Sequence, residues 1–174
     1  MATINNTTDI TSLTSADVKG LTAAQMSGLT TAQVVALTSA QVPLLNLTQL
    51  NALNSAQIAV LDASDVALIQ AGVIPYLGTV ALAAMTSAQV VALTSAQAAK
   101  LTGTQIDKLT NFASLDASDL SKVSATDFGN IGTAQLYNLT TAQAAALTSE
   151  QVFSLSTAKI AKLQAEDVGA PTSL

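Results

Sequence analysis

Apolar residues recur along almost the whole chain in an eight-residue pattern, shown most clearly by Leu-Thr-Thr-Ala-Gln-Val-Val-Ala at residues 29–36. We label the eight positions of this octad a to h. Position a is almost always Leu, as at Leu21, Leu37 and Leu93, and position f is also apolar, as at Val34. An apolar pattern this short, kept in phase this long, is typical of a stacked repeat architecture.

The polar positions predict a short helix that begins again in every octad. Position b is usually Thr, Ser, Asn or Asp, whose side chains accept hydrogen bonds from the first turn of a helix. Position e, three residues later, is usually Gln or Asp, which completes a capping box, and positions a and f form a hydrophobic staple around it. A single long helix is excluded, because position a would drift by roughly 80° per octad. A strand is disfavoured, because positions a and f would point to opposite faces.

We therefore expect an all-α solenoid of very short capped helices, one per eight-residue repeat. Helices this short are not stable alone, so neighbouring octads must bury positions a and f together. We expect positions b, c and e to lie near the surface. Two octads per coil would give a rod roughly 80 to 100 Å long, whereas three or four would make it shorter and thicker.

The repeat pattern predicts a single solenoid with two arrays. We expect the two arrays to be offset or bent relative to one another, because a six-residue unit interrupts the phase between them. The predicted parts of the solenoid at residues 1–174 are an N-terminal capping repeat (5–12), a first array (13–108), the phase break (109–114), a second array (115–170) and a tail (171–174).

The two octads at residues 69–84 depart from the pattern. Gln70 and Gly78 stand at position b, apolar residues stand at position e, and a proline enters the segment. The segment is either a repacked pair of coils or an apolar contact surface for another subunit. In the second case the candidate self-association surface is Val73, Ile74, Pro75, Tyr76 and Leu77.

Composition points to association and away from nucleic acid. Apolar residues make up 49% of the chain, whereas only 10% are charged, against roughly 25% in typical soluble domains. A chain this poor in charge hides its sides or associates. The net charge of −5, with only 6 basic residues, argues against a nucleic-acid partner.

No catalytic arrangement is present in the repeat. The absence of Cys and His excludes thiol chemistry, histidine catalysis and the usual zinc sites. The paired carboxylates Asp62/Asp65 and Asp116/Asp119, each within Leu-Asp-Ala-Ser-Asp, lack the loop pattern of a calcium site. We interpret them as a cap and a third-residue acid, and expect no enzyme activity, metal or cofactor.

We expect neither a membrane span nor a cleaved leader. The apolar stretch at residues 71–85 contains Gly and Pro and is shorter than the roughly 20 residues that a membrane helix needs. The N-terminus has neither a basic start nor an apolar run, so we expect no cleaved signal peptide.

Runs such as Leu-Thr-Thr-Ala-Gln-Val resemble the octapeptide repeat tracts of large secreted bacterial surface and adhesin-like proteins, and the resemblance covers residues 13–170. The opening Met-Ala-Thr-Ile-Asn is similar to the start of bacterial proteins that are exported without a cleaved signal. The resemblance implies a bacterial protein at the cell surface or outside the cell, and it carries no catalytic residues with it.

We therefore expect a non-enzymatic extracellular structural protein, a homo-oligomer or polymer that forms a filament, surface layer or matrix. Two alternatives stay open. The first is a binding solenoid that holds a protein or glycan partner through outward residues such as Tyr76, Tyr137 and Phe153. The second is a passive spacer, which needs only the rod itself.

Overall fold

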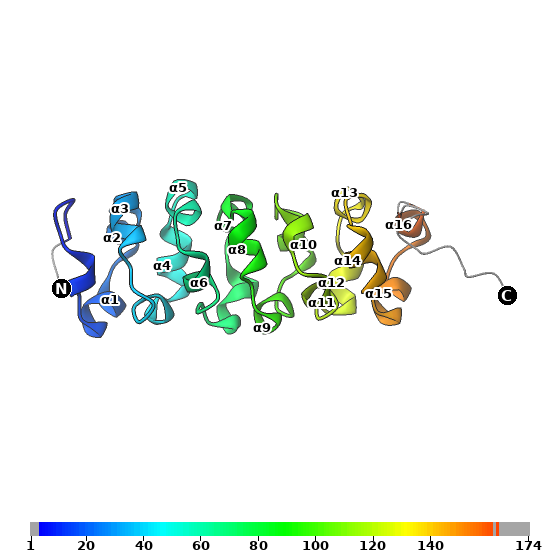
Figure 1. The fold of residues 1–174 in the computed structure, drawn as a ribbon, viewed down its shortest axis with the longest axis horizontal. Helices are drawn as coiled ribbons and strands as arrows, with labels where there is room; N and C mark the ends of the chain where they lie inside the picture. The colour runs from blue at the N-terminus through cyan, green and yellow to red at the C-terminus, as the bar shows by residue number, and fades with distance from the viewer. Residues whose placement is uncertain (1–3, 162, 164–174) are drawn as a thin grey trace.

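The structure is a computed structural model that describes residues 4–161 and residue 163. The octads stack into one elongated rod, and the described chain runs from one end of this rod to the other (Figure 1). Every regular element in the described residues is a short helix, and none of these residues forms a strand. The expected all-α solenoid of short helices is confirmed.

Most octads contain one α-helix, and a few contain a 3₁₀-helix instead. The α-helices are α1 (Ser15–Gly20), α2 (Ala23–Gly28), α3 (Thr31–Val35), α4 (Leu47–Ala52), α5 (Ser55–Ala59), α6 (Ala63–Val66), α7 (Thr79–Ala84), α8 (Ser87–Val91), α9 (Ser95–Ala98), α10 (Gly103–Ile106), α11 (Ala117–Leu120), α12 (Ala125–Gly129), α13 (Thr133–Tyr137), α14 (Thr141–Ala145), α15 (Ser149–Phe153) and α16 (Thr157–Ile160). The 3₁₀-helices are η1 (Ile10–Ser12), η2 (Val42–Leu44), η3 (Ala71–Tyr76) and η4 (Phe112–Ser114).

The beginning and end of each helix follow from the octad. In α8, the Thr86 side chain accepts from the backbone N–H of Gln89, and the Thr86 N–H donates to Gln89 Oε1 at 2.8 Å. This reciprocal pair is the predicted capping box, and it recurs in most octads that carry Thr or Asn at position b. Some helices end directly at an extended position-a residue, as α4 does at Leu53 with φ −68° and ψ 134°, and others end before position a, as α8 does at Ala92.

The core is a single column of apolar side chains along the rod axis. Positions a and f supply almost all of it, from Ile10 near one end to Leu163 near the other. Because each helix is too short to be stable alone, this shared core is what holds the coils together.

The prediction that position e lies near the surface is wrong for most octads. The Gln97 side chain, only 1% exposed, uses its Oε1 atom to accept from the Thr94 N–H at 2.8 Å. Its Nε2 atom donates to the carbonyl oxygens of Val66 and Ile69 on the preceding coil, both at 2.8 Å. We call this arrangement a glutamine bridge, because one side chain caps its own helix and joins it to the coil before.

Glutamine bridges recur with the same register along the rod. In most of them Nε2 donates to carbonyl oxygens 31 and 28 residues earlier, at positions f and a. The Gln residues that follow this register are Gln41, Gln49, Gln57, Gln89, Gln97, Gln105, Gln143 and Gln151. Helices also pack against those three octads earlier, as α4 does on α2 and α7 on α5. Each coil therefore contains about three octads, not two.

The core and the hydrogen bonds between coils continue across the phase break at 109–114. Phe112 is buried in the place of a position-f residue, and its carbonyl oxygen accepts from Gln143 Nε2 at 3.1 Å. Asn111 stands in for the missing Gln, because its Nδ2 donates to the Met85 carbonyl oxygen at 2.7 Å. The rod keeps its direction there (Figure 1), so the expected bend between the arrays is not found.

The last predicted octad, 163–170, and the tail at 171–174 lie outside the described residues, apart from Leu163. In the described part of the chain, none of the helices has the length and apolar character needed to cross a membrane.

The glutamine bridge predicts a large difference between two identical substitutions. Gln97→Glu keeps an oxygen for the Thr94 cap, but it removes the donor and places a charge beside two buried carbonyl oxygens. We expect it to lower the free energy of unfolding by about 2–4 kcal/mol, measured by urea denaturation.

The matched control is Gln70→Glu. The Gln70 amide also donates to a carbonyl oxygen of the preceding coil, that of Pro43, but this bond is exposed and 3.2 Å long. We expect a loss below about 1 kcal/mol here, because solvent replaces the lost donor. Equal losses in the two variants would contradict the role of buried amides between the coils.

Candidate functional site

The first carboxylate of each Leu-Asp-Ala-Ser-Asp motif is a helix cap. Asp62 Oδ1 accepts from the backbone N–H and the hydroxyl of Ser64, at 2.8 and 2.5 Å. Asp116 accepts from Ser118 in the same way, at 2.8 and 2.6 Å. The hydroxyl bond, and then the amide bond, hold the pKa of both carboxyls below the ordinary value for Asp. The interpretation of these residues as caps is confirmed.

The second carboxylate of each motif has a different role. Asp65 is only 5% exposed, and it accepts from the hydroxyl of Ser39 on the preceding coil at 2.7 Å. Asp119 accepts from the Ser95 hydroxyl in the equivalent place. The two acids of each pair therefore bind different partners, and the described residues contain no group of three or more potential metal ligands.

Most of the predicted self-association surface belongs to the core. Ile74 is only 2% exposed, so its assignment to a contact surface is corrected. Val73 and Leu77 are partly buried and pack against the core, and Pro75 is also half-buried. Only Tyr76, at 68% exposure, presents a large side chain to solvent. Sequence periodicity already placed Ile74 at position f and Leu77 at position a, which was the available signal for their burial.

The octad that begins at Leu77 receives its cap from another coil. Gly78, at position b, has no side chain with which to cap α7. Asn51 of the preceding coil replaces it, because its Oδ1 accepts from the Gly78 N–H at 2.8 Å and its Nδ2 donates to the Tyr76 carbonyl oxygen at 3.2 Å. The loss of the cap at this octad is therefore compensated from outside it.

The same replacement occurs at Gly132, before α13. Asp107 Oδ1 on the preceding coil accepts from the Gly132 N–H at 2.6 Å. A Cβ atom at Gly132 would lie 3.1 Å from both carboxylate oxygens of Asp107, so this close approach favours glycine. The sequence contained a signal for this pair, since Asp107 is unusual among the acids in standing at position g.

A small apolar cavity lies in the core beside the irregular octads. It has a volume of about 30 Å³, and its lining includes Leu50, Leu61, Ile74, Ala81 and Leu101. Ala81 stands where most octads have Gln, so the missing side chain accounts for part of the space. The cavity has no polar lining and holds roughly the volume of one methylene group.

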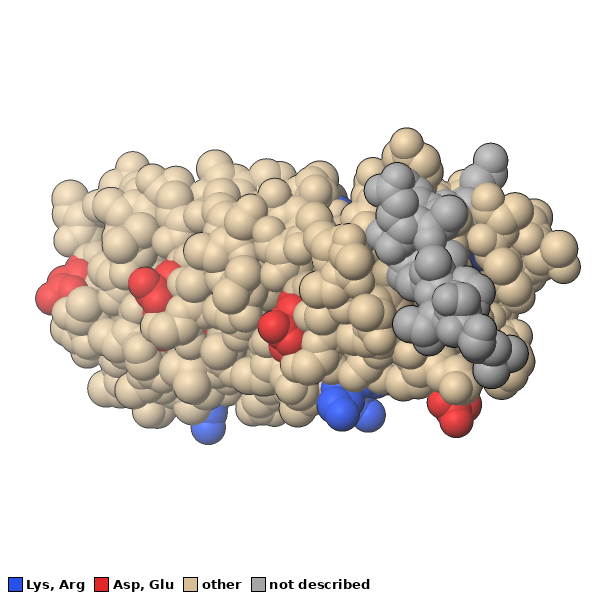
Figure 2. Space-filling model, turned by 45° about the vertical axis from the view of Figure 1, so that its right-hand side comes forward, with Lys and Arg blue, Asp and Glu red and all other residues tan. Residues whose placement is uncertain are grey.

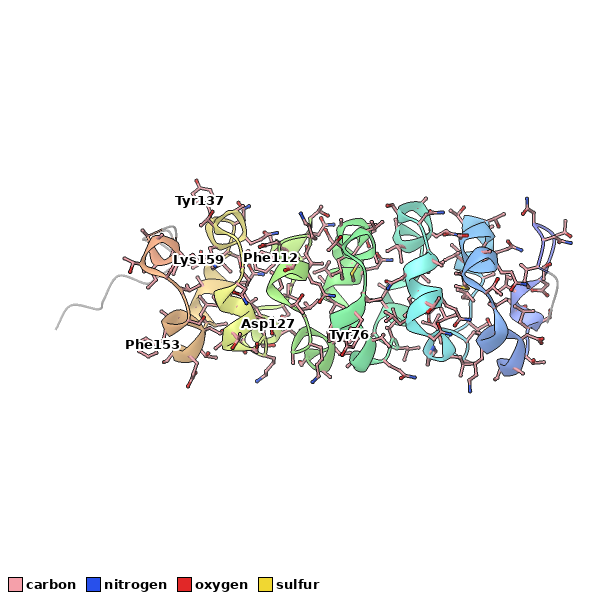
Figure 3. The ribbon with its side chains drawn as sticks, turned by 180° about the vertical axis from the view of Figure 1, so that it is seen from behind. Tyr76, Phe112, Asp127, Tyr137, Phe153 and Lys159 are labelled. Carbon is pink, nitrogen blue, oxygen red and sulfur yellow. The ribbon has the colours of Figure 1, made fainter. Side chains whose placement is uncertain are left out.

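The three outward aromatic side chains do not form one surface. Tyr137 extends from one edge of the rod, Phe153 lies toward the opposite edge, and Tyr76 lies well along the rod from both (Figure 3). The side of the rod seen in Figure 2 is mostly uncharged, with acidic side chains at a few separate places. A shared aromatic face for one ligand is therefore not built by these residues.

Comparison with known proteins identifies a repeat family. The model of the ALTTAQ repeat family matches residues 10–47, 74–111 and 124–157, which together make up more than half of the chain. Both Leu-Asp-Ala-Ser-Asp motifs fall between the matched stretches. No curated protein and no solved structure matches the chain.

The cap supplied by Asp107 predicts a compensating pair of substitutions. Asp107→Ala removes the acceptor for the Gly132 N–H, and we expect it to lower the free energy of unfolding by about 1 kcal/mol. Gly132→Ser is also expected to destabilise the protein, because its Cβ crowds the carboxylate. In the double variant the introduced serine caps its own helix in the space that Asp107 has left, so the stability should return to within about 0.5 kcal/mol of the wild type. Additive losses in urea denaturation would contradict this pairing.

The two capping carboxylates predict a specific dependence on pH. Their lowered folded-state pKa means that they contribute stability above the ordinary Asp pKa of about 3.9 and lose this contribution as the pH falls through the lower value. Asp62→Asn/Asp116→Asn should therefore lose less stability than the wild type between about pH 6 and pH 2, by urea midpoints. Glu150→Gln, in a helix capped by Thr148, is the control and should follow the wild type.

Proposed function

The chain belongs to the ALTTAQ repeat family, and from this premise we propose that it is a non-enzymatic structural protein, a rod whose copies associate through their sides. The observation that carries the proposal is the glutamine bridge. It uses a recurring feature of the octad itself to bond one coil to the next, so that lengthening the array lengthens one continuous rod.

The use of polar side chains supports a structural role. The buried Gln side chains serve caps and carbonyl oxygens of the preceding coil, and the buried Asp65 and Asp119 accept from serines of the preceding coil. The cavity between the coils is apolar and too small for a substrate. The polar side chains inside the rod thus form hydrogen bonds that cap the helices and stack the coils.

Association through the sides is supported by what the rod exposes. Val35, Val91 and Phe153, all at position g, are exposed apolar side chains, and Tyr76 is a fourth at position h. Few charges stand between them, since charged residues are only 10% of the chain. Apolar side chains on a surface with so little charge favour contact between rods.

We also propose that the protein acts outside a bacterial cell, in a filament, surface layer or matrix. The support for this setting is the resemblance of its octads to those of secreted bacterial surface proteins. A second function, the passive spacer, is favoured by the separation of the three outward aromatic residues (Figure 3), which gives no common face for a ligand.

The association predicts a concentration-dependent assembly that is weakened by loss of exposed apolar side chains. We expect the wild-type protein to form growing assemblies in sedimentation velocity, with ordered filaments or sheets in electron microscopy. Val35→Lys/Val91→Lys/Phe153→Lys should require at least about tenfold more protein to assemble, because three exposed apolar contacts are lost.

The matched control is Ala59→Lys/Ala83→Lys/Ala145→Lys, which adds the same charge at exposed position-g residues without removing a large apolar side chain. It should assemble at nearly the wild-type concentration. A wild-type protein that stays monomeric at every concentration would overturn self-association and favour the spacer. Equal dispersal of both triple variants would show that the named apolar residues do not form the contact.

A further inference from the structure

After the first coil, in which Gln33 donates to the Asn5 and Thr8 carbonyl oxygens, coils with glutamine bridges alternate with coils that have none. The coil at residues 37–60 is bridged to the one before it through Gln41, Gln49 and Gln57. The coil at 85–108 is bridged through Gln89, Gln97 and Gln105, and the coil at 131–154 through Gln135, Gln143 and Gln151. The two coils between these, 61–84 and 109–130, contain no Gln at position e.

Coil 61–84 contributes no buried amide to its junction with coil 37–60, and one amide from the following coil crosses the junction at its edge, from Gln89 Nε2 to the Ile58 carbonyl oxygen at 2.7 Å. Position e is occupied there by Asp65, Val73 and Ala81, none of which carries an amide side chain. The bonds that replace the bridges lie at the rod surface. The Gln70 and Asn51 bonds are exposed, and the bond from Ser39 to Asp65 is only partly buried.

An apolar cavity of about 30 Å³ lies in the core of coil 61–84. Leu50 and Ile58 line it from coil 37–60, and Leu93 and Leu101 line it from coil 85–108. Unfilled volume forfeits dispersion contacts, so coil 61–84 packs less tightly toward both of its neighbours. Apolar packing still crosses the junction with coil 37–60, because α7 packs on α5. The two junctions of this coil therefore differ chiefly in their buried amides.

The junction before coil 109–130 repeats the change two coils later. Only Asn111 donates an amide to the preceding coil from a position-e place, and Asp119 and Asp127 have carboxylates there instead. A carboxylate cannot donate to the carbonyl oxygens that a Gln would reach. Ser95 donates to Asp119 here as Ser39 does to Asp65. As at the first junction, one Gln of the coil beyond reaches across, from Gln135 Nε2 to the Ile106 carbonyl oxygen at 3.2 Å.

We propose that the rod is built of two-coil units at residues 13–60, 61–108 and 109–154, and that it opens first at the two junctions between them, where the following coil has no Gln at position e. We call these junctions the seams. Within each unit the buried amides couple the two coils, so the unit unfolds as a whole. At each seam the hydrogen bonds that replace the bridges are exposed or only partly buried, which lets one unit separate from the next while both keep their own cores. The seams are therefore two defined positions at which the rod is easiest to open.

Hydrogen–deuterium exchange of the full chain under increasing urea tests the units directly. We expect the helix amides to fall into three groups, each with a common opening free energy and urea dependence, with boundaries at 60/61 and 108/109. One common value for the whole rod, or boundaries inside a unit such as 84/85, would overturn the proposal. The measurement uses dispersed single rods, so it does not depend on whether the proposed self-association is right.

Two variants test whether the first seam is caused by the missing amide at position e. Ala81→Gln supplies a side chain at position e of the first seam, and we expect exchange in coil 61–84 to slow at least tenfold as the first two groups merge. Ala83→Gln, which adds the same side chain at an exposed position, is the control and should leave the groups unchanged.

The reverse change is Gln97→Ala, which removes two buried bonds inside the middle unit. It should make coils 61–84 and 85–108 exchange as separate groups. The proposal is overturned if Ala81→Gln matches its control and Gln97→Ala leaves the middle unit whole. The wild-type exchange pattern decides the matter by itself if Ala81→Gln does not fold.

Discussion

The carbonyl oxygens at the ends of very short helices are the constraint on which this structure depends. A helix of four to six residues pairs few of its backbone groups internally, and those that face another coil are buried away from water. The amide of a position-e Gln meets this need from both sides. Its oxygen accepts from the cap of its own helix, and its nitrogen donates to two carbonyl oxygens of the coil before. One residue type thus serves local helix formation and the stacking of coils.

Much of the local structure could be predicted from the octad. The cap at position b, the paired residue at e and the staple at a and f are local features, so their spacing determines them without knowledge of the fold. The burial of position e could not be seen in this way, because it depends on an atom reaching a coil 28 to 31 residues earlier. The number of octads per coil was hidden for the same reason. The sequence of one octad does not determine the angle by which each octad is rotated relative to the one before it.

The irregular segments also separate into local features that the sequence predicts and contacts between coils that it does not. The departures from the octad pattern correctly identified residues 69–84 and 109–114 as irregular. They did not predict the structure that these residues form. The assignment of Ile74 to a surface gave too much weight to the unusual composition and too little to the phase, which placed this residue in the core. Asn111 and Asn51 act on groups in other coils, so their roles follow only from the packing. The function of the exposed side chains is not encoded in the repeat at all, because capping and stacking place no demand on them.

The glycine caps bear on how such an array can change its length. An octad with its own Thr and Gln brings both of its bonding partners wherever it is inserted, so gain or loss of one such octad leaves the remaining joints intact. Gly78 and Gly132 differ, since each depends on a residue 27 or 25 positions earlier. Duplication or loss of an octad between the members of either pair would place a different residue opposite the glycine. These two pairs therefore fix the number of octads between their members, whereas the number of octads elsewhere in the chain can vary more easily.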